Sequence, residues 1–132
     1  MLRTWIRHFL ALAFFGWLCW IIYLADTGQG FSAFRWVQRH PGTDKLGHFL
    51  LFGGLAWLIN LALNFRCARI GPLAIPWGAL VVLVFAIGEE MTQLFFPSRT
   101  FDFADMLADC CGVAFFTLLQ HGWRCRRAAA KS

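Results

Sequence analysis

Long apolar segments alternate with short polar ones along the chain, and four of the apolar segments are as long as a membrane-spanning helix. Their approximate limits are 9–25, 46–64, 73–96 and 103–119. A helix needs about 20 mostly apolar residues, and at least about 17, to cross the hydrocarbon core of a bilayer. The pattern therefore predicts an all-α fold, an integral membrane four-helix bundle that forms a single membrane domain over residues 1–132.

Turn-forming or polar sequences separate these segments. Gly-Pro at 71–72 interrupts the chain between the second and third segments, and Pro-Ser at 97–98 interrupts it between the third and fourth. The second of these turns is short, so the third and fourth helices should be antiparallel neighbours. Between the first two segments, residues 31–37 place apolar side chains on one helical face, which predicts a short interfacial helix. A plain loop with scattered aromatic residues is the alternative.

The first apolar segment has some features of a signal peptide, because Arg3 and Arg7 precede it. Its apolar run of about 17 residues is longer than the hydrophobic region of a usual signal peptide. The sequence Asp-Thr-Gly at 26–28 offers no small-residue cleavage site. We therefore expect this segment to be retained as the first helix.

Composition favours the membrane interpretation over a very apolar soluble core. Hydrophobic residues make up 59% of the chain and charged residues only 14%, whereas soluble domains carry about a quarter charged residues. Fifteen Phe and seven Trp suit a surface that faces lipid and headgroups. The five cysteines form no C-x-x-C pair, so we interpret them as reduced, small apolar residues and not as a disulfide framework or a zinc site.

Basic residues flank the apolar segments unevenly. The side of the N-terminus would hold Arg3, Arg7, Arg66, Arg69, Arg124, Arg126, Arg127 and Lys131, and the opposite side Arg35, Arg39, Lys45 and Arg99. Cytoplasmic loops are enriched in Lys and Arg. We therefore expect both termini to be cytoplasmic. This topology explains the net charge of +5, so no nucleic-acid partner is expected.

The acidic residues gather toward the outer side, which the topology rule does not require. They are Asp26, Asp44, Glu89, Glu90, Asp102, Asp105 and Asp109. At a rise of 1.5 Å per residue, His48, Glu90 and Asp105 each lie about 21–25 Å from the inner end of their helix, and Asp109 about 15 Å. Because an ionised group near the bilayer centre costs at least about 2.5–3.5 kcal/mol, these side chains should face one another or a wet pocket on the periplasmic side.

This polar layer is the candidate functional site. Glu90 or Asp105 could act as a general base and His48 could shuttle the proton, so these three are the candidate catalytic residues. The candidate ligand-binding residues are Lys45, Glu89, Gln93, Arg99, Asp102 and Asp109. Lys45 and Arg99 would hold a phosphate or carboxylate. A metal ion bound by the three catalytic candidates is an alternative that no H-E-x-x-H spacing supports, so no metal site is predicted, and the sequence leaves the cofactor unknown.

Each of these residues also has a purely structural interpretation. His48 could bond a backbone carbonyl, Glu90 could pair with Arg99 or Lys45, and Asp102 could cap the fourth helix. The convergence of five carboxylates, a histidine and two cations at one end of the bundle exceeds what helix locking requires. Ionisable residues inside a membrane are functional candidates by default.

Three stretches of this layer resemble the VanZ-like family of small membrane proteins. They are D-K-L-G-H at 44–48, E-E-M-T-Q at 89–93 and P-S-R-T-F-D-F-A-D at 97–105, and Gly112 follows them. The family pattern is approximately D-K-x-x-H, then E-x-x-Q-x-x-x-P-x-R-x-x-D-x-x-D, then an amide-x-x-Gly. Where the family usually has Asn, this chain has Asp109. The family's founding member is associated with resistance to the lipoglycopeptide teicoplanin, a trait of that member that does not extend automatically to this chain. The resemblance implies a bacterial cytoplasmic (inner) membrane protein of the cell envelope, from a family in which antibiotic resistance is one known role.

These observations leave three functions open. The first is an intramembrane enzyme acting on an envelope lipid or lipid-linked glycan. The second is a non-catalytic protein that binds an anionic lipid, a glycolipid or a lipoglycopeptide at the outer leaflet. The third is an assembly protein whose polar layer locks the helices. Acids outnumber bases in the layer, which favours proton chemistry or a bound cation over pure anion binding. Membrane lipids are partners in all three, and the oligomeric state stays open.

Overall fold

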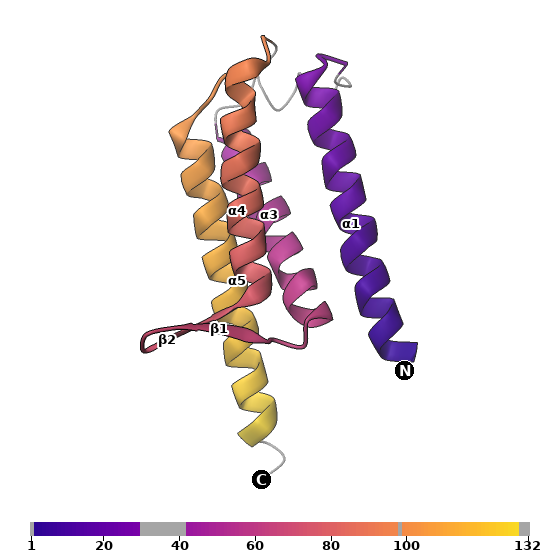
Figure 1. The fold of residues 1–132 in the computed structure, drawn as a ribbon, viewed down its shortest axis with the longest axis vertical. Helices are drawn as coiled ribbons and strands as arrows, with labels where there is room; N and C mark the ends of the chain where they lie inside the picture. Colours follow the sequence, from indigo (N-terminus) through magenta and orange to yellow (C-terminus); the bar gives the residue numbers. More distant parts are fainter. Residues whose placement is uncertain (1, 30–41, 98, 130–132) are drawn as a thin grey trace.

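The computed structural model describes residues 2–29, 42–97 and 99–129. Within these residues, four long helices run side by side (Figure 1). They are α1 (Leu2–Asp26), α3 (Thr43–Ala62), α4 (Trp77–Thr92) and α5 (Phe103–Ala129). A 3-10 turn, η1 (Gln93–Phe95), extends α4 by about one turn. The bundle confirms the predicted fold class.

The outward surface of the bundle is strongly apolar. Large apolar side chains on it are widely exposed, as in Phe9 (70%), Val84 (72%) and Leu118 (71%). All four helices are long and apolar enough to cross a membrane. An apolar surface of this extent marks contact with lipid or another apolar partner. The chain is therefore an integral membrane protein, and lipid forms its immediate environment.

The tightest contact in the bundle is the crossing of α3 and α5. A Cβ atom on Gly112 would overlap the carbonyl oxygen of Phe49 and lie 2.8 Å from its carbonyl carbon. A Cβ atom on Gly53 would lie 2.8 Å from the carbonyl oxygen of Gly112. Small residues at such a crossing let two helix backbones approach closely. The crossing lies beside His48 and Asp109 in the sequence, so it brings these two side chains within reach of each other.

An apolar core lies between the helices, and all four of them contribute to it. Its buried members are Leu18, Phe52, Leu55, Ala56, Ala79, Val82, Ala86 and Val113. At the start of α4, Gly78 allows a second close approach, because a Cβ atom there would lie 2.7 Å from the backbone nitrogen of Asn60. This packing fixes the relative positions of the three helices that carry the polar layer.

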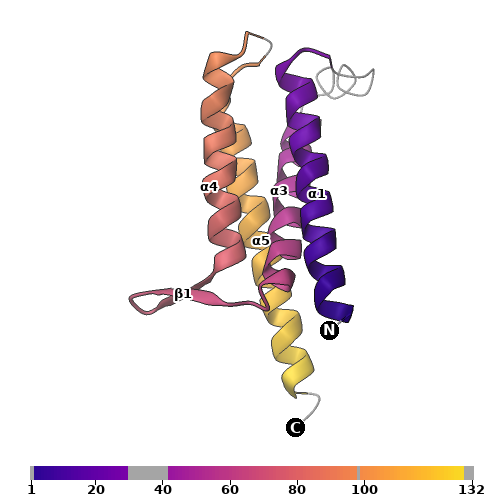
Figure 2. The same ribbon diagram turned by 45° about the vertical axis from the view of Figure 1, so that its right-hand side comes forward.

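The connection between α3 and α4 forms a β-hairpin that the apolar pattern does not predict. Strand β1 (Cys67–Ile70) pairs antiparallel with β2 (Leu73–Pro76), and Gly71 in the turn has a φ of 61°. The hairpin projects sideways from the bundle, at the end where α1 begins and α5 ends (Figures 1 and 2). Residues 73–76 are apolar, and their hydropathy predicts that they belong to the third helix. Pro76 explains the difference, since the residue before a proline, here Ile75, avoids helical geometry.

Other predicted limits also differ from the structure. Helix α5 continues to Ala129, beyond the expected end near 119, because the basic residues that follow are good helix formers. Helix α1 begins at Leu2, before the predicted start of its apolar run. The predicted interfacial helix, with Arg35 and Arg39, lies outside the described residues.

Candidate functional site

The polar layer lies at the end of the bundle opposite to the hairpin, where α4 ends and α5 begins (Figure 1). Helix α3 supplies Lys45 and His48, the end of α4 and η1 supply Glu89, Glu90 and Gln93, and the start of α5 supplies Asp105 and Asp109. Arg99 and Asp102 come from the connection between α4 and α5. All nine predicted site residues lie in the described part of the chain, at this one end.

Lys45 joins α3 to the beginning of α5. Its Nζ donates hydrogen bonds to Asp102 Oδ2 at 2.7 Å and to Asp105 Oδ1 at 2.9 Å. The side chains of Lys45 and Asp102 are 42% and 46% exposed, whereas that of Asp105 is 7% exposed. The hydrogen bond from Lys45 holds the pKa of Asp102, which lies outside the membrane-spanning segments, below its usual value of 3.8. Lys45 and Asp102 therefore form the solvent-exposed edge of the layer.

Asp102 also caps α5, in agreement with its structural interpretation. Its Oδ1 accepts a hydrogen bond from the backbone N–H of Ala104 at 2.8 Å. Its own backbone N–H donates to Glu90 Oε1 at 2.9 Å. The cap therefore fixes the beginning of α5 and at the same time orients the carboxylate of Glu90.

His48 and Asp109 form the buried part of the layer. His48 Nδ1 lies 3.0 Å from Asp109 Oδ1, and the ring of Phe52 stacks on the imidazole with centroids 5.9 Å apart. The Asp109 side chain is fully buried and that of His48 is 12% exposed. The second oxygen of Asp109, Oδ2, has no hydrogen-bond partner among the described residues. A fully buried carboxylate oxygen without a partner is unusual in a folded protein.

Gln93 and Arg99 link Glu89 and Glu90 to the segment that joins α4 to α5. Gln93 Nε2 donates to Glu90 Oε2 at 3.0 Å and to Glu89 Oε1 at 3.2 Å. Arg99 Nη2 lies 3.5 Å from Glu89 Oε1, and Arg99 Nε lies 4.0 Å from Asp26 Oδ1. The arginine therefore pairs with Glu89 and with the end of α1. The sequence places Asp26 among the outer acids but not among the candidate site residues, because nothing in its spacing links it to another helix.

Two sets of possible metal ligands meet within the layer. One ring nitrogen of His48 and one carboxylate oxygen each from Glu90 and Asp109 lie within 4.8 Å of one another. The same holds for His48 with Asp44 and Asp105. Asp44 was not among the predicted site residues, although its i,i+4 spacing to His48 was visible in the sequence. Acids outnumber bases in this cluster, so full ionisation would leave a net negative charge inside the bundle.

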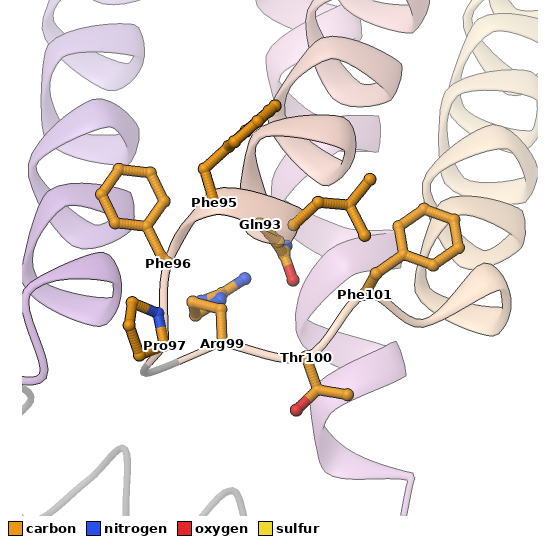
Figure 3. Close-up of a pocket in the computed structure, with 8 residues that line it drawn as sticks. Gln93, Phe95, Phe96, Pro97, Arg99, Thr100 and Phe101 are labelled. Atoms are coloured by element: carbon orange, nitrogen blue, oxygen red, sulfur yellow. The ribbon is translucent and has the colours of Figure 1, made fainter.

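A pocket of about 490 Å³ opens beside this network. It is lined by Gln93, Leu94, Phe95, Phe96, Pro97, Arg99, Thr100 and Phe101. Figure 3 shows Arg99 and Gln93 near its middle, with the rings of Phe96 and Phe101 on either side of them. Phe95 is 82% exposed. The pocket thus combines one cationic group with an apolar rim, which suits an amphiphile that carries a negative charge.

Glu90 lies closer to the start of its helix than the sequence predicts. Because α4 begins at Trp77 and not near Leu73, Glu90 lies about 20 Å along the helix axis instead of about 25 Å. A hydrocarbon core is about 30 Å thick. Measured from the start of α4, the carboxylate of Glu90 is therefore about 10 Å below the far headgroups, at a depth where ionised groups need partners.

Comparison with known sequences agrees with the resemblance of the motifs. The sequence model of the VanZ/LLP1 family matches residues 5–124, which include every residue of the polar layer. No curated protein and no solved structure matches the chain. Since the family match covers most of the chain, this protein belongs to the VanZ/LLP1 family.

Proposed function

We propose that this protein binds the anionic headgroup of an envelope lipid or lipid-linked glycan at the outer side of the bacterial cytoplasmic membrane. The observation that carries the proposal is the pocket at the α4–α5 connection, where Arg99 and Gln93 lie among exposed aromatic side chains. A lipid would place its acyl chains against the apolar rim and its phosphate or carboxylate on the guanidinium, which binds such groups in bidentate fashion.

Arg99 has the capacity to accept such a ligand. Its contacts with Glu89 and Asp26 are 3.5 and 4.0 Å long, whereas a strong charged hydrogen bond is about 2.7–2.9 Å long. A guanidinium carries five N–H donors. The two acids therefore hold Arg99 in place by loose contacts, and a phosphate can form shorter bonds with it.

The proposed orientation is supported by the basic residues at the other end of the bundle. Arg66, Arg69, Arg124 and Arg126 are exposed there, near the start of α1 and the end of α5. Lys and Arg concentrate on the cytoplasmic side of membrane proteins. In this orientation both termini are cytoplasmic and the pocket faces the outer leaflet, where lipid-linked precursors and lipoglycopeptides such as teicoplanin are found.

Retention of lipid by the purified protein tests the proposal. The wild type, Arg99→Ala and Arg99→Lys are compared by native mass spectrometry in detergent containing phosphatidylglycerol or phosphatidylcholine. We expect the wild type to retain the anionic lipid in preference. Arg99→Ala should lower that retention about 10- to 100-fold, since hydrogen bonds to charged groups contribute about 1.5–3 kcal/mol. Arg99→Lys should give an intermediate value, because lysine keeps the charge but loses the bidentate geometry.

Arg69→Ala is the matched control, because it removes an exposed arginine at the opposite end of the bundle. It should leave retention of the anionic lipid unchanged. Loss of retention in Arg69→Ala together with normal retention in Arg99→Ala would refute the proposal, since the lipid would then bind at the hairpin end. Equal retention by all variants would refute it as well.

A second candidate function is acid–base catalysis on the bound headgroup, and the buried contact between His48 and Asp109 favours it. In this candidate function Glu90 or Asp105 takes up a proton, and His48, oriented by Asp109, transfers it. The mass of the retained lipid distinguishes binding from catalysis. Wild-type protein should convert part of the lipid, whereas Glu90→Gln should retain it unaltered. Lipid of identical mass in both proteins would remove Glu90 as a catalytic residue.

A further inference from the structure

We propose that His48, Glu90 and Asp109 bind a divalent metal ion such as Zn²⁺ beneath the headgroup pocket. The inference deepens the proposed function and rests on it in one respect, since the ion would act in the same site. It depends on three observations, which are the convergence of the three side chains, an oxygen without a partner and the balance of charge.

The three side chains come from three different helices and offer the ligand types that Zn²⁺ accepts. One ring nitrogen of His48 and one oxygen each of Glu90 and Asp109 lie within 4.8 Å of one another. Bonds of about 2.0–2.2 Å to a common ion would hold such atoms up to about 4 Å apart. Small side-chain rotations therefore suffice to close the site. Three protein ligands leave a coordination position open, as in catalytic zinc sites.

Asp109 provides the second observation. Its side chain is fully buried, its Oδ1 contacts His48, and its Oδ2 has no hydrogen-bond partner among the described residues. A buried polar atom without a partner costs about 1–3 kcal/mol, and more when the group is charged. A metal ion would supply the missing partner for this carboxylate.

The balance of charge provides the third observation. Lys45 is shared between Asp102 and Asp105, and Arg99 lies beside Glu89. Glu90 receives hydrogen bonds only from neutral donors, the backbone of Asp102 and the amide of Gln93, among the contacts that the described residues make. Two carboxylates, a neutral imidazole and a divalent ion together carry no net charge. The ion would thus remove the electrostatic cost of burying Glu90 and Asp109 inside the bundle.

The neighbouring set of Asp44, His48 and Asp105 is less suitable. Asp44 is exposed, and Asp105 already receives a hydrogen bond from the Lys45 ammonium at 2.9 Å. A cation at that distance would repel a metal ion. By contrast, Gln93 and the backbone of Asp102 orient the carboxylate of Glu90 in the way that neighbouring hydrogen bonds orient metal ligands.

Metal analysis of the full-length protein tests the inference. Wild type, Asp109→Asn and Asp44→Asn are purified in detergent, incubated with Zn²⁺, separated from free ion and analysed by inductively coupled plasma mass spectrometry. We expect about one ion per chain in the wild type and in Asp44→Asn. Asp109→Asn should lower the affinity for Zn²⁺ at least 10-fold.

Thermal unfolding provides a measurement that is independent of activity and reveals a misfolded variant. Zn²⁺ should raise the unfolding temperature of the wild type and of Asp44→Asn, and EDTA should reverse the shift. Folded Asp109→Asn should show a clearly smaller shift at the same Zn²⁺ concentration. A wild type without Zn²⁺ or without a shift would overturn the inference, as would loss of the ion in Asp44→Asn but not in Asp109→Asn.

The two proposals fail separately. A metal-free wild type that still retains anionic lipid through Arg99 refutes the metal site and leaves headgroup binding intact. A protein that binds Zn²⁺ but shows no preference for anionic lipid refutes headgroup binding and leaves the metal site intact.

Discussion

Substitution of Gly112 by alanine tests whether the crossing of α3 and α5 positions the polar layer. The added Cβ would overlap the carbonyl oxygen of Phe49 and lie 2.8 Å from its carbonyl carbon and 2.9 Å from its Cα. These are backbone atoms, which no side-chain rotation can move away. The two helices must therefore separate at this point.

The distances give the size of the effect. Ordinary contact begins at 3.4 Å, so the carbonyl carbon must move away by at least about 0.6 Å. Phe49 is adjacent to His48, and Asp109 lies one helical turn before Gly112. A shift of this size would lengthen the 3.0 Å contact between His48 and Asp109 to about 3.6 Å, beyond the range of a hydrogen bond. Overpacking costs about 1–3 kcal/mol, and loss of the hydrogen bond adds about 1 kcal/mol or more.

Thermal unfolding in detergent, followed by circular dichroism, measures this cost. We expect the unfolding temperature of Gly112→Ala to fall by on the order of 10 °C. The matched control is Gly122→Ala on the same helix, where an added Cβ has no atom within 4 Å. The control should be slightly more stable than the wild type, by about 0.5–1 kcal/mol, since alanine favours helix over glycine. If Gly112→Ala and Gly122→Ala unfold at the same temperature, the helices do not cross as closely as described.

Three further outcomes are expected. Gly78→Ala should also lower the unfolding temperature, because its Cβ would lie 2.7 Å from the backbone nitrogen of Asn60; an unchanged temperature would contradict the close approach of α4 to α3. Asp102→Asn should unfold at a lower temperature than the wild type at neutral pH. The difference should shrink as the pH falls below about 4, because Lys45 lowers the pKa of folded Asp102 and the ion pair's contribution to stability is lost when Asp102 is protonated. A pH-independent difference would argue against this ion pair. Arg7→Ala should change the free energy of unfolding by less than about 1 kcal/mol, since its hydrogen bond to Asn64, just after α3, is exposed; a larger loss of stability would show that α1 depends on this contact.

The helices could be predicted from the sequence because lipid imposes a simple rule. A segment that crosses a bilayer must be long and apolar, and hydropathy reports that property directly. The same rule failed at Leu73–Pro76, where an apolar sequence forms a strand. Hydropathy does not distinguish an apolar strand from an apolar helix, and Pro76, which disfavours helical geometry at Ile75, was the signal in the sequence for the strand.

The sequence indicates most of the residues that form the polar layer, but not which of them pair. Spacing along a helix shows which side chains share a face, so the grouping of Asp105 with Asp109 was visible in the sequence. Contacts between helices depend on their separation and rotation, which spacing does not determine. The bond of Lys45 to two aspartates, the proximity of Arg99 to Asp26, and the unpaired Oδ2 of Asp109 therefore emerged only from the structure.

The hairpin between α3 and α4 limits how far the bundle can sink into the bilayer. A two-stranded ribbon leaves backbone N–H and C=O groups unpaired along both of its long edges, and hydrocarbon cannot solvate them. The ribbon must therefore stay at the level of the headgroups. The hydrocarbon core must then begin near Trp77, where α4 starts directly after the ribbon. Thinning or thickening the bilayer would then move the opposite leaflet relative to the Arg99 pocket and leave the hairpin where it is. Under the proposed function, lipid chain length should consequently control how readily a headgroup reaches that pocket.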